Sequence, residues 1–199
     1  MEAVTLGTGQ VLVRSDGSKL ARLYDPVTNA WSDTGLQTIQ RSLPSMTLLA
    51  NGKVLLAGGA SSGGVRESSV EIYDPLTNAW TATGSMTAGR GAHAAVLMRD
   101  GRVLVASGFS GSGEVPGAEI YDPSTGAWLS IAPPLLPRHS ASLNLLADGR
   151  LLLAGGFTAN GVTAHSEIYD PVANTWTLTG ALAFPRNGMM GSPMAHATV

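Results

Sequence analysis

Short apolar runs separated by turn residues recur along the whole chain, and none keeps the spacing of an amphipathic helix. Three of these runs follow Asn-Gly or Asp-Gly and end in glycine, at residues 54–59, 103–108 and 151–156. Asn-Gly or Asp-Gly between two apolar runs favours a two-residue hairpin turn of type I′, because that turn needs positive φ at both central positions. The pattern therefore predicts hairpins such as residues 92–98 paired with residues 102–106.

A second hairpin is predicted around each copy of the tripeptide Tyr-Asp-Pro. Proline presets φ where the turn begins, and the turn position four residues after Asp is Asn in three copies and Gly in the other. These two residue types tolerate a left-handed backbone, and the Asp before each Pro is expected to cap the turn as a hydrogen-bond acceptor. This hairpin joins strands such as residues 70–73 and 79–81, so each unit should hold four short antiparallel strands.

The two hairpins recur with a fixed period, and the period decides the architecture. Tyr-Asp-Pro begins at residues 24, 73, 121 and 169, so the copies are 49, 48 and 48 residues apart. A Trp follows each Tyr by seven residues, and an Arg follows each Trp by ten. Four-stranded units with a period of about 40 to 50 residues are typical of β-propellers. We expect the paired glycines where strands crowd toward the propeller axis and the Trp and Tyr rings between blades.

An apolar strand ending in Gly-Gly, a variable loop, Tyr-Asp-Pro and a Trp seven residues later resemble the kelch repeat. The resemblance covers nearly the whole chain and implies an all-β fold, a β-propeller of four-stranded antiparallel kelch blades with four repeats present. The domain spans residues 1–199. Its repeat cores are approximately residues 1–35, 36–84, 85–132 and 133–180, and residues 181–199 are the start of a fifth unit. The first copy departs from the pattern, since Val11-Leu12-Val13 is not followed by Gly-Gly.

Kelch propellers usually contain more than four blades, and both ends of this chain fall inside an element of the repeat. Residues 193–199 resemble residues 91–96, which lead into the innermost strand of a blade. We therefore expect the chain to be part of a larger propeller. A four-bladed ring and a homodimer that shares one eight-bladed ring are the alternatives. An open arc would expose the apolar faces of its terminal blades, which predicts self-association through them.

Composition narrows the class of partner. Only 13% of the residues are charged and the net charge is -2, so the chain has no electrostatic footprint for nucleic acid. No apolar run approaches the roughly 18 residues that a membrane span needs. The chain has no Cys, and its four His keep no metal-ligand spacing, so we predict no metal site and no cofactor. His93 and His196 occupy a strand position that kelch repeats often fill with His, which indicates packing.

Candidate ligand-binding residues fall into two groups. The variable loops before Tyr-Asp-Pro, at residues 15–19, 60–69, 109–117 and 157–166, lie on one face in kelch proteins, and loops on a rigid scaffold carry function. The loop residues with charged, aromatic or imidazole side chains that could contact a ligand are Arg66, Phe109, Glu114, Phe157 and His165. The second group is the Arg of each repeat, namely Arg41, Arg90, Arg138 and Arg186. In kelch adaptors that this chain resembles, arginines at this position bind acidic peptides through forked donors; the alternative is a structural role.

The resemblance implies a noncatalytic binding or interaction scaffold with no catalytic residue, whose ligand is a protein or peptide, with carbohydrate as the alternative. The other reading is the propeller part of a carbohydrate-active enzyme. A sialic-acid mutarotase-like enzyme would use groups such as Arg90, Arg138, Glu114 and His139, and a galactose-oxidase-like enzyme would have its metal site outside this segment. Similarity to bacterial secreted or surface kelch proteins predicts a secreted or cell-surface location.

Overall fold

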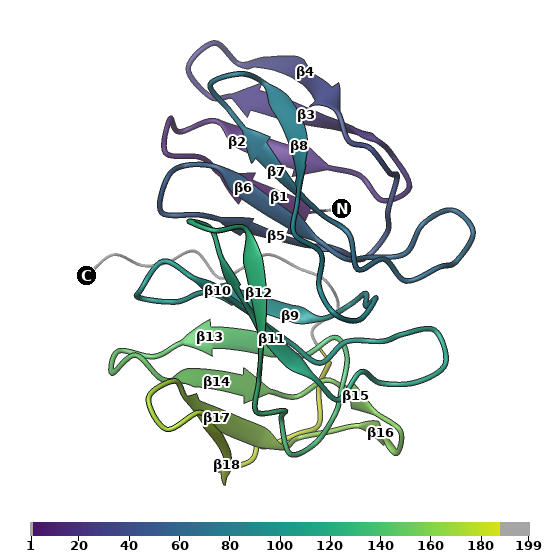
Figure 1. Ribbon diagram of the computed structural model, residues 1–199, viewed down its shortest axis with the longest axis vertical. Coiled ribbons are helices and arrows are strands. Elements are labelled where there is room, and N and C mark those ends of the chain that lie inside the picture. Colours follow the sequence, from purple (N-terminus) through teal and green to yellow (C-terminus); the bar gives the residue numbers. More distant parts are fainter. Residues whose placement is uncertain (1, 188–199) are drawn as a thin grey trace.

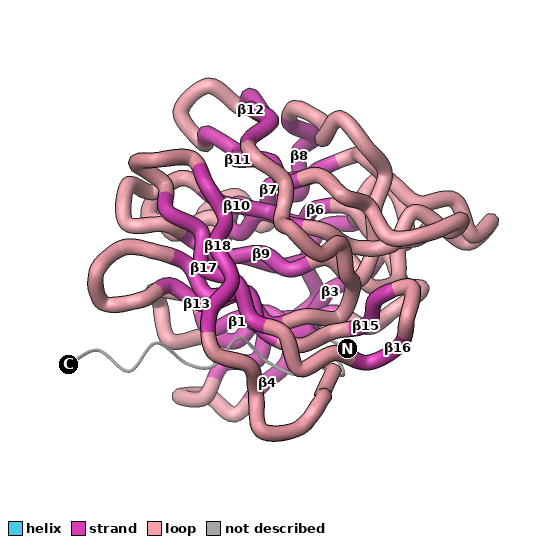
Figure 2. Tube along the Cα trace, turned by 90° about the horizontal axis from the view of Figure 1, so that it is seen from below, coloured by secondary structure: helices cyan, strands magenta, loops and turns pink. Residues whose placement is uncertain are grey.

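The computed structural model describes residues 2–187, which form four four-stranded antiparallel sheets and one two-stranded hairpin (Figure 1). In each large sheet the neighbouring strands follow chain order, so each sheet is one blade. These residues form strands and loops with no helix among them (Figure 2). The predicted all-β fold of four-stranded blades is confirmed.

Each blade begins with its innermost strand, and the innermost strands of successive blades contact one another. Blade 1 contains β1 (Glu2–Thr5), β2 (Val11–Arg14), β3 (Leu20–Asp25) and β4 (Ala30–Leu36). Blade 2 contains β5 (Ser45–Leu48), β6 (Val54–Ala57), β7 (Val70–Asp74) and β8 (Ala79–Thr83). Blade 3 contains β9 (Ala94–Leu97), β10 (Val103–Ala106), β11 (Ala118–Asp122) and β12 (Ala127–Ile131). Blade 4 contains β13 (Ser142–Leu145), β14 (Leu151–Ala154), β17 (Ser166–Asp170) and β18 (Thr175–Thr179), with the hairpin β15 (Phe157–Thr158) and β16 (Gly161–Val162) before β17.

The hydrophobic core is divided into three layers, each between two successive blades. Leu12 and Leu56 meet in the layer between blades 1 and 2. The layer between blades 2 and 3 holds Val70 and Val103, and the third layer includes Leu153. Because each blade has apolar residues on both faces, the blades stack in chain order along the long axis of the molecule (Figure 1).

The Trp side chains of blades 2, 3 and 4 each donate an indole hydrogen bond to the preceding blade. The bonds join Trp80 Nε1 to Thr34 Oγ1 (3.3 Å), Trp128 Nε1 to the Gly84 carbonyl (2.7 Å) and Trp176 Nε1 to the Ala132 carbonyl (2.8 Å). In blade 1, which no described blade precedes, Trp31 is 49% exposed. The predicted packing of the rings between blades is therefore confirmed in blades 2 to 4 and differs in blade 1.

The Tyr-Asp-Pro turns have the predicted backbone. The left-handed position has φ values of 54° at Asn29, 52° at Asn78, 72° at Gly126 and 53° at Asn174. The Asp side chain caps each turn: Asp25 Oδ1, for example, accepts the Val27 amide at 2.8 Å. This amide donor holds the pKa of Asp25 below its ordinary value.

The Asp-Gly turns differ from the predicted type I′. Gly101 has φ 83°, whereas Asp100 is not among the residues with positive φ. The Gly101 amide donates to the Met98 carbonyl (3.1 Å) and the Met98 amide to the Arg102 carbonyl (2.8 Å). This is a three-residue loop, in which a type I turn is followed by a left-handed glycine. The two-residue prediction was wrong because both loop types place Gly at this position.

The paired glycines lie where chain segments crowd at the ends of the inner strands, as predicted. A Cβ on Gly58 would lie 2.4 Å from the Arg90 carbonyl oxygen, and one on Gly155 would lie 2.3 Å from that of Arg186. His93 is buried in the same region, with Nε2 at 2.8 Å from Ser45 Oγ. This supports a packing role for His93; His196 lies outside the described residues.

Acid should destabilise the fold through His93. Burial lowers the pKa of His93 to about 3, whereas His in an unfolded chain titrates near 6.5. Between these pH values the unfolded state binds one more proton than the folded state. The contribution of His93 to the free energy of unfolding is therefore present above pH 6.5 and is lost as pH falls toward 3. Urea unfolding should show that His93→Gln removes about 2–3 kcal/mol of the difference in unfolding free energy between pH 7 and pH 4.5.

The exposed His165 provides the matched control for this measurement. His165→Gln removes an exposed imidazole and so measures what the loss of a surface histidine alone does to the pH profile. Identical pH profiles for the wild type and His93→Gln would show that His93 takes up a proton as readily in the folded chain as in the unfolded one.

Candidate ligand-binding surface

The loops that precede the Tyr-Asp-Pro strands gather on one side of the molecule, at the right in Figure 1. We call this side, formed by residues 15–19, 60–69, 109–117 and 157–166, the loop face. The Asp-Gly and Tyr-Asp-Pro turns lie on the opposite side, because antiparallel strands return the chain after each crossing of the blade. We call the opposite side the turn face.

Three of the four predicted arginines are buried beneath the loop face, at 0–1% exposure: Arg41, Arg90 and Arg138. Arg90 shows the shared arrangement. Its Nη1 donates to the carbonyls of Ser107 (3.0 Å) and Gly117 (2.8 Å), and its Nη2 donates to Glu119 Oε1 (2.7 Å). These acceptors belong to the same blade as the arginine. The structure thus places the three guanidinium groups inside their blades rather than on a surface that a ligand touches.

The carboxylate partners of these arginines were not singled out from the sequence. They are the buried Glu71, Glu119 and Glu167, each two residues before the Tyr of its repeat. Each also accepts a backbone amide, as Glu119 Oε2 does from Thr87 at 2.8 Å. Desolvation by burial lowers the pKa of all three arginines. The signal was the recurrence of Glu at this position in three repeats, where blade 1 has Arg22.

Arg186, the fourth arginine of the series, has an exposed side chain. Its carbonyl accepts the Gly156 amide at 2.9 Å, and its own amide donates to the Thr163 carbonyl at 3.3 Å. Within the described residues its side chain therefore does not repeat the buried arrangement of the other three. Its backbone does repeat the contact that Arg90 makes with Gly59.

Four side chains from three blades form a continuous row on the loop face. The guanidinium carbon of Arg66 lies 5.5 Å from the ring centroid of Phe109. The Phe109 and His139 centroids are 5.4 Å apart with the rings tilted by 60°, and His139 stacks on Phe157 at 5.4 Å and 12°. We call Arg66, Phe109, His139 and Phe157 the cation-aromatic row. All four are partly exposed.

Equivalent backbone positions in successive blades build this row. Phe109 and Phe157 each follow the paired-glycine position, and they form β-bridges to Gly91 and His139, the residues after the buried arginines. Because position 91 lacks a side chain, Arg66 from blade 2 extends over it, with Nη1 at 3.4 Å from where a Cβ would stand. Arg66 therefore packs on Phe109 in blade 3, much as His139 packs on Phe157 in blade 4.

The structure unites three predicted residues in the row, and two more lie beside it. The Glu114 backbone forms a β-bridge with Phe109, and its side chain is partly exposed. His165 is exposed, and its carbonyl accepts Arg138 Nη1 at 2.7 Å. His139 had been considered only as a group for the enzyme alternative. Its place between two Phe rings depends on contacts 18 and 30 residues apart in sequence, which a linear pattern does not show.

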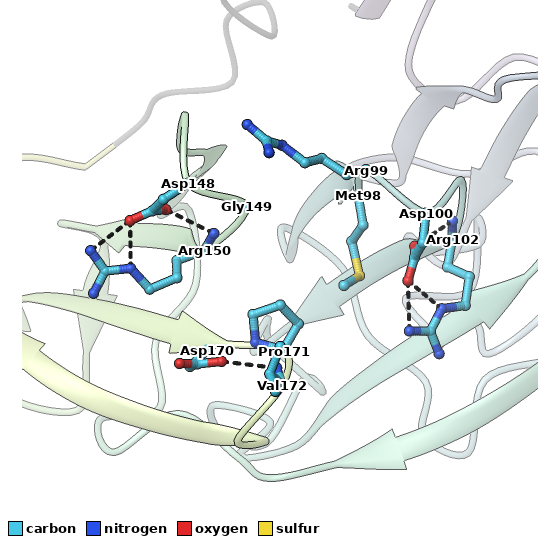
Figure 3. Close-up of a pocket in the computed structure, with 10 residues that line it drawn as sticks. All are labelled: Met98, Arg99, Asp100, Arg102, Asp148, Gly149, Arg150, Asp170, Pro171 and Val172. Atoms are coloured by element: carbon cyan, nitrogen blue, oxygen red, sulfur yellow. Dashed lines mark hydrogen bonds and ion pairs between the residues drawn. The ribbon is translucent and has the colours of Figure 1, made fainter.

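The turn face holds an open cavity of about 520 Å³ between blades 3 and 4 (Figure 3). Two ion pairs, Asp100–Arg102 and Asp148–Arg150, flank it, each with a 2.7 Å contact between residues of a single turn. The equivalent turns one blade earlier form a groove of about 420 Å³ between blades 2 and 3, and the turn at residues 100–102 is shared by both. Because the cavity repeats with the blades and its flanking pairs neutralise themselves, it is a product of the architecture and carries no separate site.

Residues 2–187 contain neither a cluster of metal-binding side chains nor a membrane-spanning helix. Among residues 2–187, no group of three or more His, Cys, Asp or Glu side chains could hold a metal ion. None of these residues forms a helix long and apolar enough to cross a membrane.

Comparison with known families matches residues 48–87 to the Kelch motif. The matched segment runs from the last residue of β5 through β8, and it includes the paired glycines, Tyr-Asp-Pro and Trp80. It is thus one copy of the unit whose other copies form the remaining blades. No curated protein matches the sequence.

Proposed function

We propose that this chain, in which residues 48–87 match the Kelch motif, is a noncatalytic scaffold that binds a peptide segment of a partner protein along its cation-aromatic row. The observation that carries the proposal is the continuity of the row. Four partly exposed side chains from three blades form it, on the face that also holds the variable loops. The distances between neighbouring ring centroids, and from the Arg66 guanidinium carbon to the Phe109 centroid, are 5.4–5.5 Å. Aromatic and Arg side chains are the residues that most often dominate protein interfaces.

The arrangement of the polar groups supports binding over catalysis. A mutarotase-like site would need Arg90 and Arg138 at the surface, but their donors bind carbonyls and Glu inside the blades. A general acid or base must come within hydrogen-bond reach of the substrate. Glu114 and His139 alone would have to carry that chemistry, and His139 already lies between two Phe rings.

The ring geometry supports a peptide over a carbohydrate. A sugar that stacks on an aromatic side chain needs an open ring face. Here Arg66 lies over the ring of Phe109, His139 also contacts that ring, and His139 covers one face of Phe157. The row therefore offers partly covered aromatic rings and a guanidinium group, which suit the mixed apolar and polar surface of an extended peptide.

Selection of random displayed peptides on the immobilised chain tests the proposal. An enriched peptide should lose affinity about tenfold or more when both Phe109 and Phe157 are replaced by Ala, because aromatic anchors carry much of the energy of an interface. Fluorescence anisotropy of the labelled peptide measures the dissociation constant. Ala60 occupies in blade 2 the position that Phe109 and Phe157 occupy in blades 3 and 4. Ala is therefore already accommodated at this position, and we expect the double variant to fold.

Val172→Ala is the matched control, because Val172 is 96% exposed on the turn face. It should leave peptide affinity unchanged. Peptides that bind the double variant as tightly as the wild type would place the binding surface elsewhere. Failure to enrich any peptide, together with Phe-dependent binding on a glycan array, would favour the carbohydrate alternative instead.

A further inference from the structure

Arg66 carries a charge that no carboxylate in the described structure neutralises. Its Nε is buried and makes no hydrogen bond, and none of the ion pairs among residues 2–187 includes Arg66. The side chain is nevertheless held in one place, since its guanidinium lies over Phe109 and its Cγ lies near Gly111. A partly buried guanidinium with unused donors favours an anionic partner.

The same chain contains a completed version of this arrangement. In blade 1 the guanidinium carbon of Arg22 lies 5.8 Å from the centroid of Trp31, and its Nε donates to Asp33 Oδ1 at 2.9 Å. Arg22 thus combines a cation-π contact with a carboxylate. Arg66 has the cation-π contact, and no described residue supplies the carboxylate.

We propose that Arg66 is the anion-binding end of the row and holds a carboxylate of the bound peptide, as Asp33 is held by Arg22. The carboxylate comes from an acidic side chain or from a peptide C-terminus, and both match the planar fork of a guanidinium. This inference rests on the proposed peptide-binding function. It adds the chemical class of the group bound at one end of the site.

The neighbouring side chains fit a carboxylate joined to an apolar group. The guanidinium of Arg66 lies over the ring of Phe109, so the cation and the apolar ring adjoin each other. The ring also offers apolar contact to the carbon atoms that bear the carboxylate. Benzoate contains both features and is therefore a suitable small probe, with the uncharged benzamide as its control.

Nuclear magnetic resonance of the arginine Nε–Hε groups tests the proposal without any peptide. The Arg66 signal is assigned by its absence in Arg66→Gln. We expect benzoate to shift this signal saturably at millimolar concentration and constant ionic strength, and benzamide to leave it in place. The Arg22 signal should not respond, because its Nε already donates to Asp33. An Arg66 signal that is unmoved, or that moves linearly together with the other exposed arginines, would overturn the proposal.

Selected peptides provide a second test that also separates the two carboxylate sources. Arg66→Gln should weaken an acidic peptide at least about tenfold, and Arg66→Lys should weaken it less, because Lys keeps the charge without the fork. Loss of affinity on replacing Asp or Glu with its amide would assign a side chain, and loss on C-terminal amidation would assign the terminus. Circular dichroism checks that the variants fold.

The outcomes distinguish this inference from the proposed function. If peptides bind through Phe109 and Phe157 but neither Arg66→Gln nor removal of the carboxylate changes affinity, the function stands and the inference fails. If benzoate binds saturably at Arg66 but no peptide is enriched, the anion site stands and the peptide-binding function fails.

Discussion

Replacing Glu119 with Ala should lower the free energy of unfolding by about 3–5 kcal/mol, the range expected when one partner of a buried ion pair is removed. Glu119 is 1% exposed, and it accepts Arg90 Nη2 at 2.7 Å and the Thr87 amide at 2.8 Å. Its loss would leave the buried guanidinium without a counter-charge and the amide without an acceptor. Urea unfolding measures the effect directly.

The first blade supplies the control for this prediction. Arg22 stands at the position of Glu119 in the repeat, and it pairs with Asp33 across the surface, where the side chains are 54% and 58% exposed. Exposed pairs contribute little because solvent screens them, so Asp33→Ala should change the unfolding free energy by less than about 1 kcal/mol. Equal losses for Asp33→Ala and Glu119→Ala would mean that the buried pairs are no more important than surface pairs.

Replacing Trp176 with Ala should destabilise the protein by about 3–5 kcal/mol. The side chain is 5% exposed in the layer between blades 3 and 4, and its indole hydrogen bond reaches the Ala132 carbonyl. Truncation removes both the packing and this bond. Chemical unfolding monitored by far-ultraviolet circular dichroism is the suitable measurement, since it does not depend on the removed fluorophore.

Trp31→Ala is the corresponding change at the exposed copy of the same position. Trp31 packs on Tyr24 at 5.1 Å, but half of its surface meets solvent, and it has no preceding blade among residues 2–187. We expect a loss below about 1.5 kcal/mol, smaller than that of Trp176→Ala. Similar losses at both positions would contradict the view that the rings act mainly between blades.

The fold was predictable because its determinants lie close together in sequence. Tyr, Asp, Pro and the left-handed Asn or Gly of each outer hairpin fall within six residues, and their spacing alone identifies the turn, the flanking strands and the period. The hairpin loops at Asp-Gly were less well predicted, since the type I′ turn and the three-residue loop share the same Gly. Backbone dihedral angles separate them, and residue types do not.

The candidate site was predicted only in part, because its contacts cross between repeats. The sequence indicated Phe109 and Phe157 as exposed loop residues, but it did not show that His139 lies between them or that Arg66 reaches from blade 2 to blade 3. Likewise, Glu119 occupies a strand position whose burial depends on an Arg 29 residues away. The location of the protein and its self-association through end blades stay predictions from sequence.

The indole hydrogen bonds from each Trp to the preceding blade affect how cooperatively the blades unfold. Each joins a blade to its predecessor, 44 to 46 residues earlier, so the described blades form a linear array with nearest-neighbour coupling. Opening an end blade breaks one apolar layer, whereas opening an interior blade breaks two. Within residues 2–187, blades 2 and 3 are therefore each held by two layers, and blades 1 and 4 by one. The cation-aromatic row spans blades 2, 3 and 4, so a ligand bound along it would add a contact that joins three successive blades.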